Sequence, residues 1–88
     1  MKVKDGFMLR EVAGQWLVIP IGERVVEFNG IITLSESGAL LWKAMEEDVD
    51  EEALVKVILG EYVIDEATAR ADVAGFITMI NERDLLDA

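Results

Sequence analysis

The sequence predicts an α+β fold in which a three-stranded antiparallel sheet precedes three helices, all within a single domain spanning residues 1–88. Two observations carry this prediction. Glycines recur every eight residues from position 6 to position 38, an interval typical of short strands joined by tight turns. After position 34 the apolar residues change to the spacing of three and four that marks a helix face.

The first two strands are expected to form a hairpin. Residues 7–12 are rich in strand-forming side chains, Ala13-Gly14 makes a compact turn, and a second strand follows over residues 15–20. Pro20 ends this strand because proline has no N–H to donate to a ladder. The second strand is apolar at five consecutive positions, which predicts that both of its faces need cover, although three short helices would most simply cover one.

A third strand is expected over Ile31–Leu34, where three β-branched residues stiffen the chain. The dipeptide Asn29-Gly30 in front of it is a strong turn signal. The preceding segment, Arg24 to Phe28, leaves two alternatives open, because its residues 25–28 suit either a short strand or an extended connection.

Three helices should follow, each opened by a side chain that can cap a helix N-terminus: Ser35, Asp50 and Asp65. The spacing of apolar residues predicts helices over about 36–47, from Asp50 to Gly60, and from Asp65 to about residue 83. The last is the longest, with five apolar residues on one face. The leucine pair at 85–86 is expected to fold back onto the core.

Composition excludes several classes of function. The chain has no histidine and no cysteine, so zinc sites of the usual kind, iron–sulfur clusters and nucleophiles paired with histidine cannot form. The absence of disulfides fits a reducing cytoplasm, and no stretch approaches the roughly 20 apolar residues of a membrane span. The net charge is −10, and residues 35–88 hold fourteen acids against four basic residues, a surface that repels nucleic acid.

The remaining candidates for chemistry have simpler explanations. The acidic run at 46–52 lacks the residue order of a calcium loop and suits a solvated link that caps a helix. The glycines lie too far apart to cradle a phosphate. Ser35 and Ser37 have no histidine to activate them. We therefore expect no catalytic residue, no metal and no cofactor.

Small residues accompany the apolar stripe of the long helix. They lie to one side of that stripe and would let another backbone come close, so that a short strand beside them would border a groove with room for one added strand. Ordinary close packing between helix and sheet explains them equally well. The small residues are Ala67, Ala71, Ala74, Gly75 and Thr78.

Two segments resemble PqqD-type proteins, the recognition elements for precursor peptides of ribosomally made, modified natural products. They are residues 29–42, which read NGIITLSESGALLW, and the ending Val73…Phe76-Ile77…Ile80…Leu85-Leu86. Ser35 stands where that family often has asparagine, and Asp84 where it often has glycine. The resemblance implies a winged helix-turn-helix fold, in which the leader of a precursor peptide adds to the edge of the third strand and lies against the third helix.

Carried onto this sequence, the resemblance implies a site with two walls. One wall is the edge Ile31–Leu34, with main-chain hydrogen bonds from Ile31, Ile32 and Thr33. The other is the long helix, which would supply apolar contacts. Arg70 either pairs with an acid on the peptide or with Glu66 one turn earlier. The implied peptide-binding residues are Ile31, Ile32, Thr33, Leu34, Arg70, Ala71, Ala74 and Thr78.

The function expected from these observations is a non-catalytic module that binds a leader peptide and presents the precursor to a separate modifying enzyme, often a radical-SAM enzyme in that family. Two alternatives stay open. A winged-helix regulator would bind DNA, although the charge opposes this. A structural subunit would pair the same strand edge with a second copy and form a homodimer.

Overall fold

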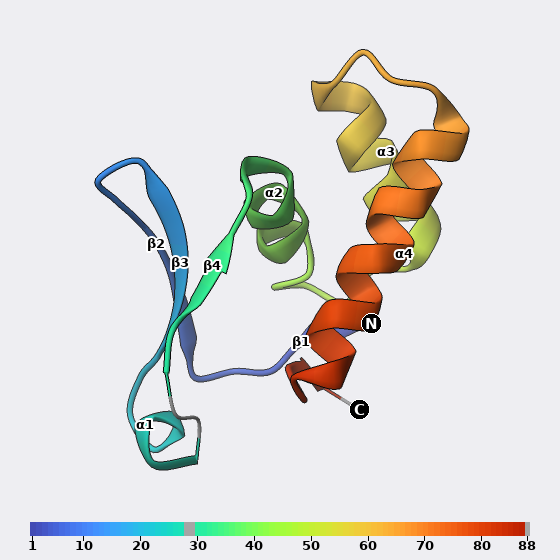
Figure 1. The fold of residues 1–88 in the computed structure, drawn as a ribbon. Coiled ribbons are helices and arrows are strands. Elements are labelled where there is room, and N and C mark those ends of the chain that lie inside the picture. Colours follow the sequence, from blue (N-terminus) through green and yellow to red (C-terminus); the bar gives the residue numbers. More distant parts are fainter. Residues whose placement is uncertain (28–29, 88) are drawn as a thin grey trace.

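The structure is a computed structural model that describes residues 1–27 and 30–87. Strands lie at the start of the chain and helices dominate its second half (Figure 1). The elements in order are β1 (Lys2–Val3), β2 (Phe7–Val12), β3 (Gln15–Pro20), α1 (Arg24–Glu27), β4 (Ile32–Leu34), α2 (Glu36–Ala44), α3 (Glu51–Glu61), α4 (Glu66–Glu82) and β5 (Leu86–Asp87).

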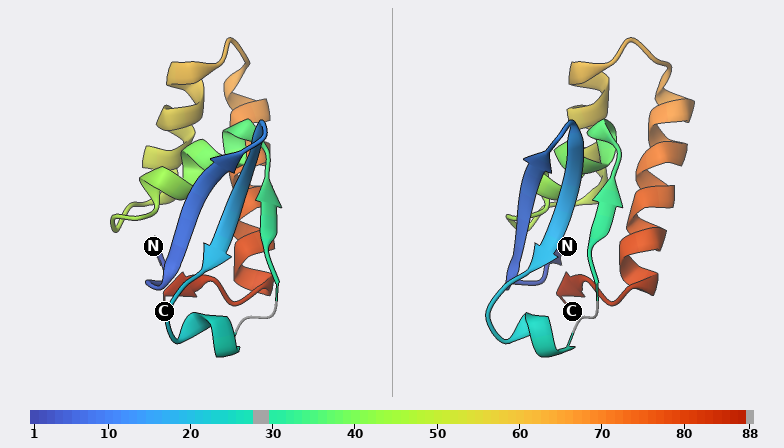
Figure 2. Two further views of the ribbon diagram at one scale, coloured as in Figure 1. Left: turned by 90° about the vertical axis from the view of Figure 1, so that its left-hand side faces the viewer. Right: turned by 60° about the vertical axis from the view of Figure 1, so that its left-hand side comes forward.

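The main sheet is antiparallel and has the strand order β2-β3-β4. The three helices α2, α3 and α4 follow it along the chain, so the predicted α+β architecture is confirmed. Figure 2 shows the helices behind this sheet and no helix in front of it. The sheet therefore has one covered face and one open face.

A two-residue turn joins β2 to β3. Ala13 and Gly14 have φ angles of 52° and 80°, and the pair Val12–Gln15 closes the turn. Positive φ at both central residues is the geometry whose twist suits a tight hairpin, and glycine adopts it without strain. The predicted hairpin and its turn are therefore confirmed, and the turn fixes the register of the two strands.

The expectation that both faces of β3 are covered is wrong. Val18 is completely buried on the face that meets the helices, while Leu17 and Ile19 on the other face are only half-buried. Their neighbour Met8 on β2 keeps 39% of its surface exposed. The continuous apolar run of β3 thus leaves apolar side chains on the outer face of the sheet, beside Arg10 and Thr33.

Residues 24–27 form the short helix α1, which corrects the alternatives of a strand or an extended connection. Gly22, with a φ of 60°, turns the chain after β3, and the backbone N–H of Arg24 then donates to the carbonyl of Ile21 at 3.2 Å. The Nε of Arg24 also donates to the carbonyl of Asp5 at 2.9 Å. Phe28 and Asn29, the first residue of the predicted turn, lie outside the described residues.

All three predicted caps are confirmed. The side chains of Ser35, Asp50 and Asp65 each accept a hydrogen bond from the backbone N–H three residues later, at distances of 3.1, 2.8 and 2.7 Å. These bonds satisfy donors that a helix start leaves unpaired. Helix α2 ends earlier than predicted, at Ala44, and helix α3 continues past Gly60.

The chain ends fold back onto the core as expected for the leucine pair. Leu85 is completely buried, and β5 beside it pairs antiparallel with β1 in a small second sheet that the sequence did not indicate. None of the helices in the described part of the chain is long and apolar enough to cross a membrane. The largest fully buried side chains are Trp42, Leu41, Met45, Leu54, Ile58, Ile80, Leu85, Val18, Val55 and Val73.

Candidate functional site

The outer edge of β4 is open. This strand is the last in the order β2-β3-β4, and within residues 1–27 and 30–87 no strand pairs with its other side. Backbone N–H and C=O groups that point away from β3 therefore have no partner in the sheet. An edge of this kind can accept an extended segment as a further strand.

The hairpin determines which residues of β3 form hydrogen bonds toward β4. In a two-residue hairpin the closing pair, here Val12 and Gln15, exchanges hydrogen bonds, and every second residue along β3 then points toward β2. The backbone N–H of Ile21, six residues after Gln15, donates to the carbonyl of Gly6 at 2.9 Å, as this alternation requires. Trp16 and Val18 consequently direct their backbone groups toward β4.

The register of β4 then shows which of its residues face the open edge. Trp16 is paired with Leu34 and Val18 with Ile32, so the backbone groups of Ile32 and Leu34 bond to β3. The N–H and C=O of Thr33 point the other way. Thr33 is therefore the strand residue that can bond to an added segment, and the expected main-chain contact from Ile32 is corrected.

The side chains of β4 alternate in the same way. Ile32 and Leu34 are each only 6% exposed and pack into the core, which holds the strand in place. The side chain of Thr33 is exposed on the outer face of the sheet. Ile31, just before the strand, has 58% of its surface exposed. Side chains of an added strand that lie opposite Ile32 and Leu34 would share their face and point toward the helices.

Helix α4 runs beside β4 on the side of the open edge, with α2 between them at the end where β4 ends (Figures 1 and 2). Two contacts show how α4 is turned. Arg70 reaches Glu52 of α3, with Nη1 2.7 Å from Oε1. The ring of Phe76 lies at the start of α2, where its Cε1 is 3.3 Å from the position that a Cβ on Gly38 would take. Arg70 and Phe76 thus lie on opposite flanks of the buried residues of α4, which are Ala69, Val73 and Ile80.

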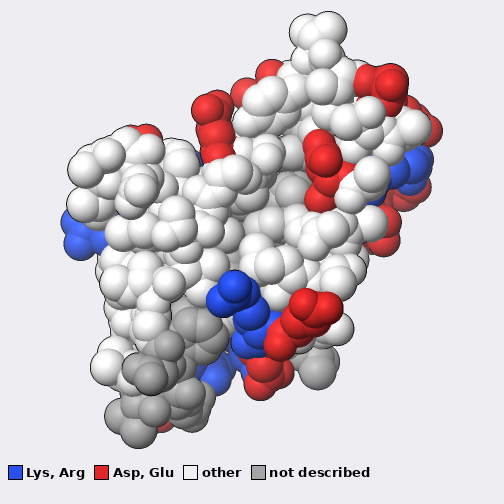
Figure 3. Space-filling view, in the orientation of Figure 1, with Lys and Arg blue, Asp and Glu red and all other residues white. Residues whose placement is uncertain are grey.

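The flank marked by Phe76 faces β4. At about 100° per residue, Asp72, Phe76 and Met79 lie together on it. Met79 is half-buried, and Asp72 lines a hollow together with residues at the start of α2. We call the space between β4 and these three side chains the β4–α4 groove. Figure 3 shows a hollow between the sheet side and the α4 side of the molecule, with acidic side chains on both sides of its upper part and basic and acidic side chains together at its lower end.

The small residues predicted to form this wall lie elsewhere. Ala71, Ala74 and Thr78 are exposed, and helical geometry places them about 140–160° around α4 from Phe76. They face solvent on the far flank rather than β4. The position of these three residues argues against the predicted apolar contacts, and Phe76 and Met79 are the apolar residues on the flank that faces β4.

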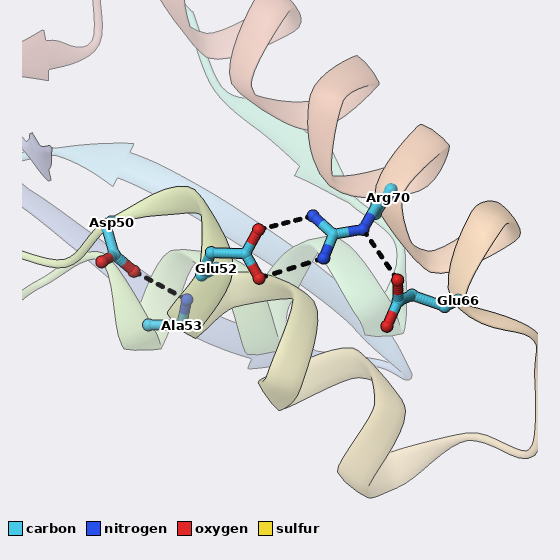
Figure 4. A network of polar contacts seen from close by, with 5 residues as sticks. All are labelled: Asp50, Glu52, Ala53, Glu66 and Arg70. Carbon is cyan, nitrogen blue, oxygen red and sulfur yellow. Dashed lines mark hydrogen bonds and ion pairs between the residues drawn. The ribbon is translucent and has the colours of Figure 1, made fainter.

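Arg70 is engaged by two carboxylates (Figure 4). Its guanidinium donates to both oxygens of Glu52, at 2.7 and 3.0 Å, and to Glu66 at 3.2 Å. These hydrogen bonds, and secondarily the positive charge, lower the pKa of Glu52. The i−4 pairing with Glu66 is thus confirmed, and Arg70 ties α3 to α4 instead of facing the β4–α4 groove.

We expect Arg70→Ala to lower the melting temperature at neutral pH only slightly, because exposed ion pairs contribute little to stability. Peptide affinity should stay within about twofold, because this ion pair lies outside the groove. A carboxyl whose pKa is lowered in the folded state stabilises the fold above its ordinary pKa of 4.5 and loses that contribution as the pH falls. The melting temperature of the variant should therefore fall less between pH 7 and pH 3 than that of the parent chain. Arg83→Ala, which breaks no ion pair in the described part of the chain, is the control. An unchanged pH profile would contradict this account.

The acidic residues do not assemble into a metal site. Among the residues that the structure describes, no group of three or more acidic, histidine or cysteine side chains could hold a metal ion. Within the acidic run, Asp50 caps α3 and Glu52 binds Arg70. These two acids have structural roles in the link between helices.

Comparison with known proteins identifies one family and two solved structures. Residues 16–86 match the family described as PqqD, Coenzyme PQQ synthesis protein D. The fold resembles the structure of TbiB1 in complex with the TbiA(beta) leader peptide, with a TM-score of 0.77 and 22% identity over 100% of this chain and 96% of that one. It also resembles lasso peptide synthetase B1 complexed with the leader peptide, with a TM-score of 0.72 and 13% identity over 96% and 93%. None of the curated proteins matches in sequence.

Proposed function

This chain belongs to the PqqD family, and we propose that it is a non-catalytic module that binds the leader of a precursor peptide by strand addition. The observation that carries the proposal is the open edge of β4, with a hollow between the sheet side and the α4 side of the molecule (Figure 3). TbiB1 and lasso peptide synthetase B1, which share the fold, were both solved with leader peptides. The bound precursor is presented to a separate modifying enzyme, for which a radical-SAM enzyme is our candidate, in the cytoplasm.

Two kinds of contact hold the leader in this proposal. Thr33, continued by Ile31 just before the strand, supplies main-chain hydrogen bonds that accept almost any sequence. Phe76 and Met79 contact alternate side chains of the added strand and supply selectivity. Ile32 and Leu34 support the edge from within the core.

The charge argues against the DNA-binding alternative. The net charge of −10 repels a phosphate backbone. A homodimer through β4 would occupy the same backbone groups that the leader needs, because a strand edge has a single row of N–H and C=O groups and can pair with only one other strand. Peptide binding and pairing through β4 should therefore exclude one another.

A titration of this chain with a short precursor peptide encoded beside its gene tests the proposal. We expect the N-terminal half of the precursor to bind with a micromolar or lower Kd and the C-terminal half to bind at least about tenfold more weakly. Sedimentation velocity of the same samples should show a one-to-one complex. Equal binding of both halves, or tight and salt-sensitive binding of duplex DNA instead, would contradict the proposal.

A further inference from the structure

A pocket of about 330 Å³ opens beyond the C-terminal end of β4, where the chain enters α2. Its walls come from the start of α2, from α3 and the segment that follows it, and from α4. The pocket thus continues the β4–α4 groove at one end. It is lined by Ser35, Glu36, Ser37, Ile58, Tyr62, Ile64 and Asp72.

The pocket combines an apolar floor with two carboxylates. Ile64 is 36% exposed and offers apolar surface, and Ile58 beneath it is buried in the core, while Glu36 and Asp72 come from two different helices. No lysine or arginine is among the described residues that line it. A side chain that is apolar along its length and positively charged at its tip complements this arrangement.

Tyr62 adds a polar atom to the pocket. Its hydroxyl is buried and lies close to the carboxylate of Glu36. Burial and, after it, the nearby negative charge of Glu36 raise the pKa of this hydroxyl. A neutral phenol that donates to a carboxylate can still accept a hydrogen bond from an incoming ammonium or guanidinium group.

The start of α2 also contributes a partial positive charge to the pocket, which by itself would favour an anion. That charge is roughly half an elementary charge and acts over the first turn only. Ser35 already accepts the hydrogen bond from Gly38, and Glu36 stands in the same first turn. Glu36 and Asp72 are both acidic and no basic residue is among the described residues that line the pocket, so its balance of charge is negative.

A strand added to β4 would deliver a side chain to this place. Residues of the added strand that lie opposite Ile32 and Leu34 point into the groove, and the next residue with the same orientation lies beyond the end of β4, beside Ser35 and Ser37. One residue of the bound peptide, two positions from the residue opposite Leu34, is therefore in reach of the pocket.

We propose, building on the leader-binding function above, that this pocket takes one lysine or arginine side chain of the bound leader. The aliphatic stem lies against Ile64, and the charged head binds Glu36 and Asp72. An uncharged aromatic or aliphatic side chain would fill the apolar part and leave both carboxylates with no counter-charge. The leader that this chain recognises should thus carry a basic residue at a fixed distance from its apolar anchors.

The test uses a displayed library of random twelve-residue peptides selected on the full chain and on the double variant Glu36→Gln/Asp72→Asn. We expect peptides selected on the parent to carry lysine or arginine at one fixed position, and this preference to disappear with the double variant. The double variant Glu47→Gln/Glu82→Gln removes two exposed carboxylates outside the pocket and is the matched control. It should keep the preference.

One selected peptide then serves as the probe. Replacing its basic residue with glutamine should weaken binding to the parent roughly fivefold to tenfold and binding to the pocket variant less than twofold. Peptides that bind through the β4 edge with no fixed basic position would overturn the pocket proposal and leave the leader-binding function standing. If no peptide were selected at all, and the encoded precursor did not bind either, both proposals would fall.

Discussion

Replacing Thr33 with proline should weaken peptide binding at least about tenfold in a chain that still folds. The backbone N–H of Thr33 points to the open edge, so the substitution removes no hydrogen bond within the sheet. It does remove the donor that an added strand needs, and the proline ring occupies the space that the strand would approach. Titration calorimetry measures the loss, and circular dichroism verifies the fold.

Ile32→Pro is the matched contrast, because the two positions are adjacent and face opposite edges. The N–H of Ile32 bonds toward Val18 of β3, and its loss leaves a buried carbonyl unpaired at a cost of about 1–3 kcal/mol. Thr33→Val keeps the outward N–H and should bind as the parent does. A folded Thr33→Pro variant with unchanged affinity would show that the β4 edge is not the binding surface.

Trp42→Ala should lower the free energy of unfolding by about 3–5 kcal/mol. Trp42 is 2% exposed, is the largest of the fully buried side chains, and meets the ring of Phe7 edge-on with ring centroids 6.2 Å apart. This contact joins α2 to β2, so its loss loosens the sheet from the helices. Urea denaturation followed by fluorescence of the remaining Trp16, or by circular dichroism, measures the change.

Trp16→Ala is the control for that prediction. Trp16 is only half-buried, and the ammonium of Lys43 lies over its ring, 4.4 Å from the ring centroid, in a cation–π contact. We expect a cost of about 1–2 kcal/mol, because part of the side chain stays in contact with water in the folded state. Equal losses for the two tryptophans would contradict the assignment of the core to α2 and the inner face of the sheet.

Much of the fold could be predicted because local signals agreed with the global structure. The turn at Ala13-Gly14 demands positive φ angles and so fixes the hairpin, and Ser35, Asp50 and Asp65 mark the helix starts through bonds within one turn. Such signals depend only on neighbours in sequence. They can therefore be recognised from the sequence without knowledge of the tertiary contacts.

Elements that depend on distant parts of the chain were not predicted. Strands β1 and β5 are two residues each and exist because the chain ends meet, with Val3 also donating to the carbonyl of Met45 at 2.8 Å. Helix α1 depends on the turn at Gly22 and on Arg24 reaching Asp5. Short segments have too few residues for a periodic pattern, so tertiary contacts decide their conformation.

The site was predicted in part for the same reason. The edge of β4 follows from the strand order, which three short strands nearly determine. The wall of the groove depends on which flank of α4 faces α3. Apolar residues lie on both sides of Val73 along the helix, so the sequence alone does not show which flank that is. The burial of Ala69, Val73 and Ile80 fixes the rotation, and the contacts of Arg70 with Glu52 and of Phe76 with the start of α2 show it. Small residues on the solvent side gave a misleading signal.

Amide hydrogen exchange at Thr33, followed by NMR, tests the central claim most directly. In the chain alone the amide of Thr33 should exchange rapidly, while those of Ile32 and Leu34 are protected by their bonds to β3. Addition of the precursor peptide should protect Thr33 and leave the other two unchanged. Protection of Thr33 in the chain alone, or rapid exchange in the saturated complex, would contradict strand addition at β4.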